Sequence, residues 1–128
     1  MSQENVEIVR RLYQAYFRGD FETALSAFAE DVVWEDMNGT YQGRDGVVEA
    51  TTRWTGAWDD LRQELEDIRD AEGGDVVVAL RQSGRGKGSG VLVQTVTGWI
   101  YTISGGKISH VRLFNDPATA MQAAGLSE

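Results

Sequence analysis

The sequence predicts an α+β fold, in which helices precede a run of antiparallel strands. Apolar residues recur at helical spacing through much of residues 6–58, interrupted by a short β-like stretch at 32–36. After Gly73 and Gly74 the chain turns to β-branched and aromatic runs, which are typical of strands. The length of 128 residues suits one domain, residues 1–128, built around one core.

Three helices are expected in the first half of the chain. The first covers residues 6–18, and Gly19 suits its C-terminal end because glycine readily adopts a positive φ. Asp20 can cap a short second helix, and Asp45 can cap the third. The apolar face of the second helix carries Phe21, Leu25 and Phe28, and that of the third carries Val47, Thr51, Trp54 and Trp58.

The segment LRQELEDIRD, residues 61–70, is ambiguous. Leu61, Leu65 and Ile68 fit a helix by their spacing, and the intervening residues have good helix propensity. Taken alone, the local pattern therefore predicts a helix here.

The second half is expected to form strands and a last short helix. The strand signals are DVVVALRQ, VLVQTVTGWIYTIS and KISHVRLFN, joined by SGRGKGSG (83–90) and by a turn at 104–107. The alternating glycines of 83–90 favour a bent hairpin over a phosphate-binding loop, because no helix follows them. Asp116 at the N-cap, Pro117 at the first position and Gly125 past the end bracket the helix.

Composition narrows the classes of partner. The net charge is −8 and the 12 basic residues are scattered among acids. This pattern argues against binding to nucleic acid and against binding to anionic membranes. The chain has no Cys and a single His, so neither thiol chemistry nor a His-rich metal site is expected. The start, MSQENVEIV, is acidic and lacks an apolar run, so a cytoplasmic protein is expected.

Several stretches together resemble one known family. They are NVEIVRRLYQAYFRGDFETALSAFAEDVVWED, YQGRDGV, RGKGSG, SGGKISHVRLFND and the terminal AAGL. Over about residues 4–125 the chain resembles the SnoaL-like family of the nuclear-transport-factor-2-like superfamily. The resemblance implies a cone-shaped α+β barrel, in which three N-terminal helices pack on a strongly bent antiparallel sheet with a pocket in its mouth. It also implies a strand at 61–70 and a homodimer, commonly packed through the outer face of the sheet.

Asp36 is the first candidate for chemistry. Ketosteroid isomerases belong to the same superfamily, and a stretch like FAEDVVWEDMNG carries their general base at the position of Asp36. Such a base works as a carboxylate in an apolar, water-poor pocket, where it accepts a proton from carbon. Strand periodicity places Asp36 and Trp34 on one face. The alternative is an acid at a strand end that bonds the turn backbone.

The rest of the isomerase pattern is incomplete in this chain. The isomerases also form an oxyanion hole from a Tyr and a protonated acid. The resemblance aligns that Tyr with Leu12 and that acid with Gly98. Tyr16, one helical turn after Leu12, would point the same way and donate to a ligand carbonyl, or it is a core residue. The final-strand acid of limonene epoxide hydrolases corresponds to Leu113, and Asp116 lies near the acid of SnoaL-type polyketide cyclases, although capping alone explains it.

Further residues are expected to line the pocket. Trp34 and Trp54 are apolar candidates, with core packing as the alternative for Trp54. The resemblance implies that Gln82 and Gln94 face inward on adjacent strands, where they bond a ligand or else Asp36 and its loop. The resemblance places Val111, Leu113 and Asn115 on the pocket side. By the same parity His110 shares the outer face with Ile108, Arg112 and Phe114, and Trp99 also lies on the outer face.

The sequence thus predicts a protein that binds a small apolar molecule. One hypothesis is a cofactor-independent isomerase or cyclase with Asp36 as general acid/base and Tyr16 as donor, needing neither a metal nor an organic cofactor. The alternative is a non-catalytic ligand-binding or dimerisation module. No nucleic-acid or membrane partner is expected.

Overall fold

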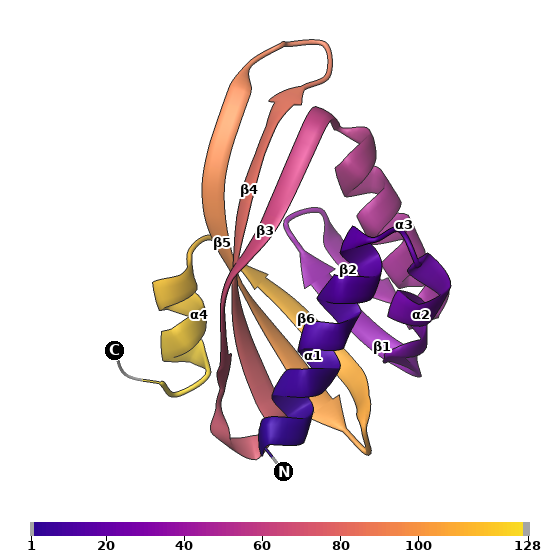
Figure 1. Ribbon diagram of the computed structural model, residues 1–128, viewed down its shortest axis with the longest axis vertical. Coiled ribbons are helices and arrows are strands. Elements are labelled where there is room, and N and C mark those ends of the chain that lie inside the picture. Colours follow the sequence, from indigo (N-terminus) through magenta and orange to yellow (C-terminus); the bar gives the residue numbers. More distant parts are fainter. Residues whose placement is uncertain (1, 127–128) are drawn as a thin grey trace.

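The computed structural model describes residues 2–126, which form a six-stranded sheet with α-helices on both sides (Figure 1). Helices α1–α3 cover one face and α4 lies on the other (Figure 1). The helices are α1 (Ser2–Phe17), α2 (Phe21–Ser26), α3 (Gly43–Gly56) and α4 (Pro117–Ala123), with a short 3-10 turn at Glu72–Gly74. The strands are β1 (Phe28–Asp36), β2 (Gly39–Gln42), β3 (Trp58–Asp70), β4 (Asp75–Gly86), β5 (Leu92–Ser104) and β6 (Lys107–Phe114). The predicted α+β class is confirmed.

The sheet is open and strongly twisted. Its strand order is β2-β1-β6-β5-β4-β3, so β2 and β3 are edge strands. Every neighbouring pair is antiparallel except β1 and β6, which run parallel. The antiparallel sheet implied by the resemblance is thus found at every pair except this one. The parallel β1–β6 pair lies between the early β1–β2 hairpin and the meander formed by β3 to β6.

The segment 61–70 is a strand, as the resemblance implied, and the helix predicted from the local pattern is wrong. Leu61 and Leu65 share a face because they are an even number of residues apart. A bulge between Leu65 and Asp67 then adds one residue, which brings Ile68 back to that face. Leu65 and Ile68 both pack against the main core. Helix-like spacing therefore arises here from a bulged strand.

Element boundaries also differ in part from the predicted ones. Phe28 begins β1 instead of ending α2, and Trp58 begins β3 instead of ending α3. Helix α3 starts at Gly43 with Gln42 as its N-cap, so Asp45 is not the cap but lies in the first turn. A carboxylate there still favours the helix, since it faces the positive end of the dipole. The predicted caps Asp20 and Asp116 are confirmed, since each accepts a bond from a backbone N–H three residues on.

Gly98 is where α4 approaches the sheet. A Cβ at this position would lie 2.6 Å from the carbonyl oxygen of Asp116 and 2.8 Å from Cβ of Ala120. The second apolar cluster lies on this face, under α4, and includes Val77, Ile100 and Ala120. Glycine is thus needed at 98 for close packing of α4 on the outer face.

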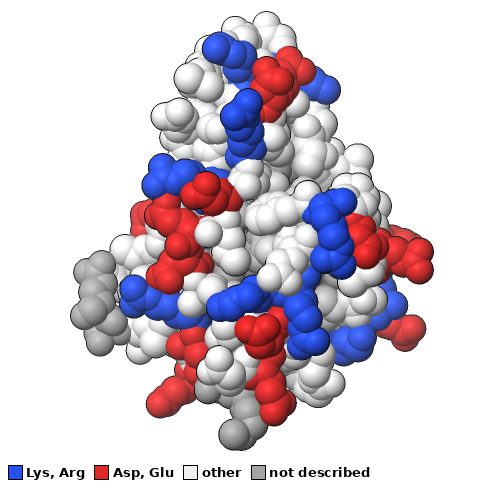
Figure 2. Space-filling model, in the orientation of Figure 1, with Lys and Arg blue, Asp and Glu red and all other residues white. Residues whose placement is uncertain are grey.

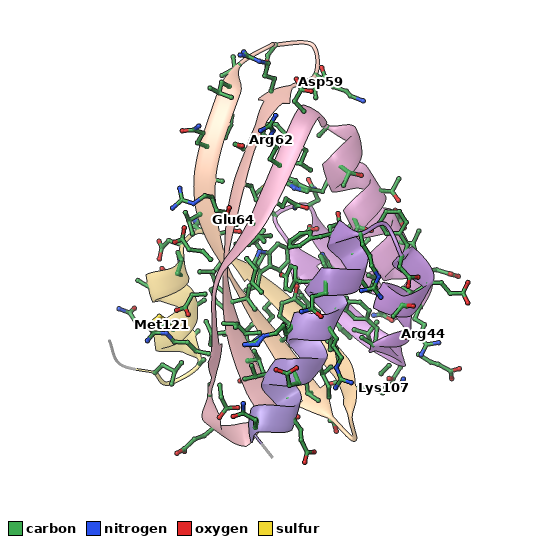
Figure 3. The ribbon with its side chains drawn as sticks, in the orientation of Figure 1. Arg44, Asp59, Arg62, Glu64, Lys107 and Met121 are labelled. Atoms are coloured by element: carbon green, nitrogen blue, oxygen red, sulfur yellow. The ribbon has the colours of Figure 1, made fainter. Side chains whose placement is uncertain are left out.

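Two basic side chains connect the helical layer to the sheet (Figure 3). Arg44 at the start of α3 donates from Nε and Nη2 to the carbonyl oxygen of Phe28, at 2.9 and 2.8 Å. Lys107 at the start of β6 donates from Nζ to the carbonyl oxygen of Ser26, at 2.7 Å. Both contacts fix the position of the α2–β1 connection.

The surface carries interspersed charges of both signs. On the face drawn in Figure 2, basic and acidic side chains alternate, and neither sign forms an extended patch. Within residues 2–126, none of the helices is long and apolar enough to cross a membrane.

Candidate functional site

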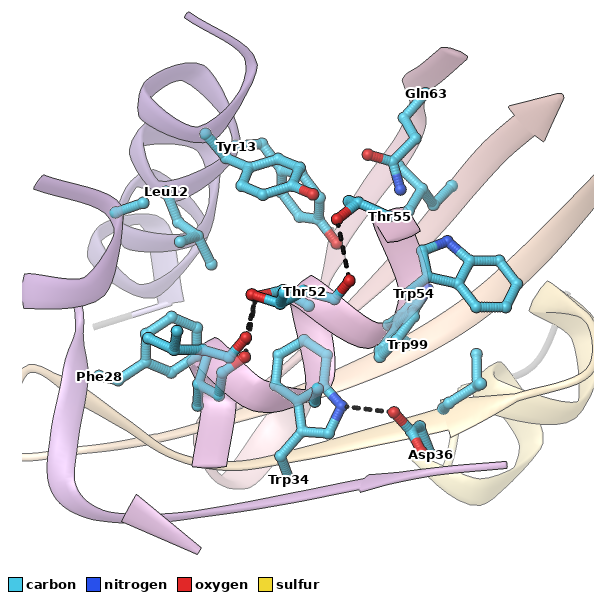
Figure 4. A pocket seen from close by; sticks show the side chains of 18 of the residues that line it. Leu12, Tyr13, Phe28, Trp34, Asp36, Thr52, Trp54, Thr55, Gln63 and Trp99 are labelled. Carbon is cyan, nitrogen blue, oxygen red and sulfur yellow. Dashed lines mark hydrogen bonds between the residues drawn. The ribbon is translucent and has the colours of Figure 1, made fainter. Parts of the chain in front are cut away.

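A cavity of about 560 Å³ lies between helices α1–α3 and the sheet (Figure 4). Its wall is rich in aromatic rings, and the charged residues that line it are Glu22 and Asp36. Near the opening, Phe21, Met37 and Val48 are exposed apolar side chains that also line the cavity. The aromatic lining consists of Tyr13, Tyr16, Phe21, Phe28, Trp34, Trp54, Trp99 and Tyr101.

Asp36 lies at the last position of β1 and lines this cavity. Its Oδ2 accepts a hydrogen bond from Nε1 of Trp34 at 3.1 Å, the dashed line beside Asp36 in Figure 4. Its Oδ1 accepts a bond from the backbone N–H of Asn38 at 2.8 Å. The carboxylate therefore bonds the turn and also lines the cavity, a position that is compatible with either interpretation of Asp36. Each oxygen keeps a further lone pair for a ligand proton.

Two buried tyrosines meet in the cavity wall. The hydroxyl oxygens of Tyr13 on α1 and Tyr101 on β5 lie 2.6 Å apart, and both rings line the cavity. Burial raises the pKa of Tyr13 well above its ordinary value, and burial likewise raises the pKa of Tyr101. Both hydroxyls therefore stay protonated at neutral pH. One O–H donates across the pair, which leaves the other hydrogen for a ligand acceptor.

Tyr16 also lines the cavity, and burial raises its pKa. Its ring packs against Phe17 and Phe21, with centroids 5.9 and 5.8 Å away. Tyr16 therefore lies in the cavity wall, and its role as a donor stays a prediction. The Tyr13–Tyr101 pair is more deeply buried than Tyr16.

A polar network lies on the β3–β4–β5 side of the cavity. Gln82 is buried, and its Oε1 accepts from Nε1 of Trp54 and from Nε2 of Gln63, each at 2.8 Å. Its Nε2 donates to Oγ1 of Thr97 at 3.4 Å, and the same oxygen accepts from Nε1 of Trp99 at 3.0 Å. Four cavity-lining side chains are therefore held around Gln82.

The structure brings most of the predicted site residues together, but not all. Val111 is fully buried in the core beneath the cavity and does not line it, while Asn115 is exposed beyond the end of β6. The prediction that Gln94 faces inward is wrong. Thr95 is the partner of Gln82 in the register of β4 and β5, so the exposed Gln94 lies on the other face, opposite Ser83. The predicted residues that do line the cavity are Tyr16, Trp34, Asp36, Trp54, Gln82 and Leu113.

The position of Trp99 shows that the inward and outward faces predicted for β5 are reversed. Trp99 was expected on the outer face but lines the cavity, where its ring packs against Trp34 with centroids 5.3 Å apart. Gly98 accordingly points outward to α4. An acid at position 98 would therefore not reach the cavity, so the matching of Gly98 to the second acid of the isomerases is misplaced. Thr97 and Trp99 are the neighbouring positions that face inward.

His110 lies on the outer face, as predicted, and pairs through Nε2 with Oε2 of Glu35. Ile108, which was expected on the same face, is fully buried in the main core. An irregularity between Thr102 and Ile103 pairs His110 with Thr102 and Ile108 with Ile103, which turns Ile108 inward. Within residues 2–126, no group of three or more His, Asp or Glu side chains is placed to hold a metal ion.

Tyr101, Gln63 and Thr97 line the cavity but were not predicted as site residues. Both faces of the β5 segment are apolar because α4 covers the outer one, so alternation alone does not mark the inner face. The useful signal was Gly98, since a glycine in a strand often marks close approach of another backbone. The inward position of Gln63 was not predicted, because the spacing of apolar residues in 61–70 indicated a helix.

The sequence matches the SnoaL-like domain family over residues 9–111. The chain belongs to this family. No match was found among curated proteins. Membership of the SnoaL-like family establishes the fold. It does not establish a specific activity, because one fold hosts many functions.

Solved structures share the fold across nearly the whole chain. An NTF2-like protein from Burkholderia thailandensis E264 is 28% identical with a TM-score of 0.79, covering 92% of this chain and 97% of that one. A candidate SnoaL-like polyketide cyclase from Jannaschia sp. CCS1 is 21% identical with a TM-score of 0.78, covering 99% and 95%. TerC, co-crystallized with polyporic acid, is 21% identical with a TM-score of 0.74, covering 95% and 98%.

Proposed function

We propose that this SnoaL-like protein binds a neutral, largely apolar carbonyl compound in its cavity and that Asp36 moves a proton next to the carbonyl. The observation that carries the proposal is a carboxylate in the wall of an aromatic cavity of about 560 Å³. Two solved relatives support a small organic ligand, since TerC was crystallized with polyporic acid and the Jannaschia protein is a candidate polyketide cyclase. The neutral charge of the proposed ligand is inferred from the cavity lining of this chain.

The proposed step needs a base and a hydrogen-bond donor. Asp36 takes a proton from the carbon beside the carbonyl, and the electrons of that C–H bond form an enolate. A tyrosine O–H, from the Tyr13–Tyr101 pair or from Tyr16, donates to the enolate oxygen. In an isomerization, the proton then returns from Asp36 to another carbon of the conjugated enolate. In a cyclization, the enolate carbon bonds to a second carbonyl carbon, the π electrons of that C=O bond move to its oxygen, and the resulting alkoxide takes the proton from Asp36. Neither route draws on a cofactor.

The test is exchange of the α-protons of 2-tetralone, a neutral bicyclic ketone, followed by NMR in D₂O. The wild-type protein is expected to accelerate exchange over buffer, and Asp36→Asn to lose most of that acceleration, about 100-fold or more. Asp31→Asn is the matched control, because Asp31 is an exposed acid on the same strand. Equal exchange by wild type and Asp36→Asn would overturn the role of Asp36.

One observation favours a second candidate, a non-catalytic ligand-binding module. Both oxygens of Asp36 already accept protein hydrogen bonds, from Trp34 and from Asn38, which suits a structural acid. A binder would hold 2-tetralone without accelerating its exchange, whereas an enzyme would do both.

We also propose that the protein is a homodimer. The family resemblance supports this, as do Val91, Leu92 and Val93, which are 58%, 54% and 37% exposed near the start of β5. Sedimentation equilibrium should give twice the chain mass, and the mass of one chain would overturn the proposal. The expected cytoplasmic location stays a prediction.

A further inference from the structure

The amide of Gln82 has a fixed orientation. Its Oε1 accepts from two donors, Nε1 of Trp54 and Nε2 of Gln63, each at 2.8 Å. A flipped amide would aim its NH₂ group at these two N–H donors and lose both bonds. Because the Gln82 side chain is buried, that loss is not recovered from water. Nε2 of Gln82 must therefore face Thr97.

The network leaves hydrogen-bonding capacity unused on the cavity side. The NH₂ group of Gln82 has two hydrogens, and its one partner among residues 2–126 is Oγ1 of Thr97, at 3.4 Å. Thr97 already accepts from Trp99, and its own hydroxyl donates to the carbonyl oxygen of Leu80. Gln63 donates one N–H of its amide to Gln82. No described residue donates a hydrogen bond to Oε1 of Gln63. Gln63 and Gln82 both line the cavity, and the half-buried Gln63 is the more accessible of the two to a ligand.

The charge of the lining selects against anions. Among residues 2–126, no Lys, Arg or His lines the cavity, and the two charged residues that line it, Glu22 and Asp36, are acids. A carboxylate or phosphate would be desolvated here without a counter-charge, which is costly. The amide pair therefore suits a neutral oxygen that both accepts and donates, such as a hydroxyl, or a carbonyl that accepts.

The amide pair and the tyrosine pair lie at different ends of one wall. Thr97, which contacts Gln82, and Tyr101 both face inward from β5 with Trp99 between them. Four residues of strand span roughly 13 Å. A ligand that reaches both ends therefore needs at least two fused rings with an oxygen at each end.

We propose that Gln63 and Gln82 form a second polar subsite, which binds a neutral oxygen at the end of the ligand away from the tyrosines. This proposal depends on one part of the proposed function, namely that the cavity binds a ligand. It does not depend on proton transfer by Asp36. It gives Gln63 the role of a specificity residue and gives Gln82 the role of holding it in place. The ligand class becomes a neutral, elongated, polycyclic compound with oxygen functions at both ends.

The test compares 2-tetralone with 6-hydroxy-2-tetralone, which differ in one hydroxyl at the end away from the ketone. Dissociation constants would be measured by NMR titration of the full chain. The wild-type protein should bind the hydroxylated ketone about five- to tenfold more tightly, the usual gain from one hydrogen bond. Gln63→Leu should bind both ketones alike, and 6-carboxy-2-tetralone should bind more weakly than either.

Gln94→Leu is the matched control, because Gln94 is an exposed glutamine on the outer face. It should keep the wild-type preference. No preference in the wild-type protein, or an equal preference in Gln63→Leu, would overturn the subsite. A wild-type preference without α-proton exchange would overturn the role of Asp36 alone, and exchange without preference would overturn the subsite alone. Failure of both ketones to bind would overturn both proposals.

Discussion

The hydroxyl groups of Tyr13 and Tyr101 lie 2.6 Å apart and join the first helix to a central strand inside the cavity. Their rings meet edge to face, with centroids 5.9 Å apart. The contact thus combines packing with a hydrogen bond between residues far apart in the sequence. Both side chains of this contact are buried.

Replacing one member of this pair should destabilize the fold. Tyr101→Phe leaves the hydroxyl of Tyr13 without its partner in an apolar wall, which should lower the free energy of unfolding by about 1–2 kcal/mol. The double variant Tyr13→Phe/Tyr101→Phe should lose less than the sum of the single variants, because it leaves no unpaired hydroxyl. Urea unfolding of all variants measures this. Tyr41→Phe, at a half-exposed tyrosine, is the control, and strictly additive losses would contradict the prediction.

The same pair should make the protein sensitive to alkaline pH. Below the ordinary tyrosine pKa of 10.0 both tyrosines are protonated in the folded and unfolded states, so they contribute no pH dependence. Above it the unfolded chain loses these protons while the folded chain keeps them, because burial raises both pKa values. The folded state then binds more protons, so the free energy of unfolding falls as pH rises.

Urea unfolding at about pH 8 and about pH 10.5 checks this sign on either side of the ordinary tyrosine pKa. The wild-type protein should lose stability between the two conditions. The double variant Tyr13→Phe/Tyr101→Phe should lose less, with Tyr16 accounting for part of the remainder, since burial raises its pKa too. Identical losses in both proteins would show that the pair does not titrate in this way.

Gly98 should tolerate no side chain. A Cβ would lie 2.6 Å from the carbonyl oxygen of Asp116, so Gly98→Ala should shift α4 and cost about 1–3 kcal/mol in the free energy of unfolding. Gly56→Ala is the control, since a Cβ there meets nothing within 4 Å. Because position 98 faces α4, Gly98→Ala should leave the affinity for 2-tetralone unchanged in the folded protein. A stable Gly98→Ala protein with altered affinity would contradict the assigned face.

Residues 32–36 and the glycine-rich turns could be placed from sequence because their signals are local. Trp34 and Asp36 share a face through strict alternation on β1, and both line the cavity as expected. The same rule failed on β5, where α4 makes the outer face apolar and the parity ambiguous. The alignment with the family assigned the opposite parity to β5, so Gln94 was placed inward and Trp99 outward.

Bulges explain two further misassignments, those of Ile68 and Ile108. A single extra residue reverses which side chains face inward, and its position depends on pairing with another strand. Ile68 on β3 and Ile108 on β6 both reach the core through such irregularities. The family resemblance supplied the strand at 61–70 because it carries this long-range pairing, which local spacing does not.

Arg44 should be important for stability although it lies outside the cavity lining. Its Nε and Nη2 both donate to the carbonyl oxygen of Phe28, at 2.9 and 2.8 Å, where β1 begins. Arg44→Ala leaves this carbonyl without either donor and should lower the free energy of unfolding by about 1.5–3 kcal/mol, as for hydrogen bonds to charged groups. Arg44→Lys can restore one donor and should lose less.

Urea unfolding with hydrogen exchange of the β1 amides measures this effect. Arg53→Ala is the control, because Arg53 is an exposed arginine on the same helix with one long contact, 3.5 Å, to the hydroxyl of Tyr41. It should change the free energy of unfolding by less than about 0.5 kcal/mol. Arg44→Ala should also speed exchange of the β1 amides, since the α2–β1 connection loses its tie to α3. Equal effects of the two substitutions would show that the paired bonds to Phe28 do not anchor the helical layer.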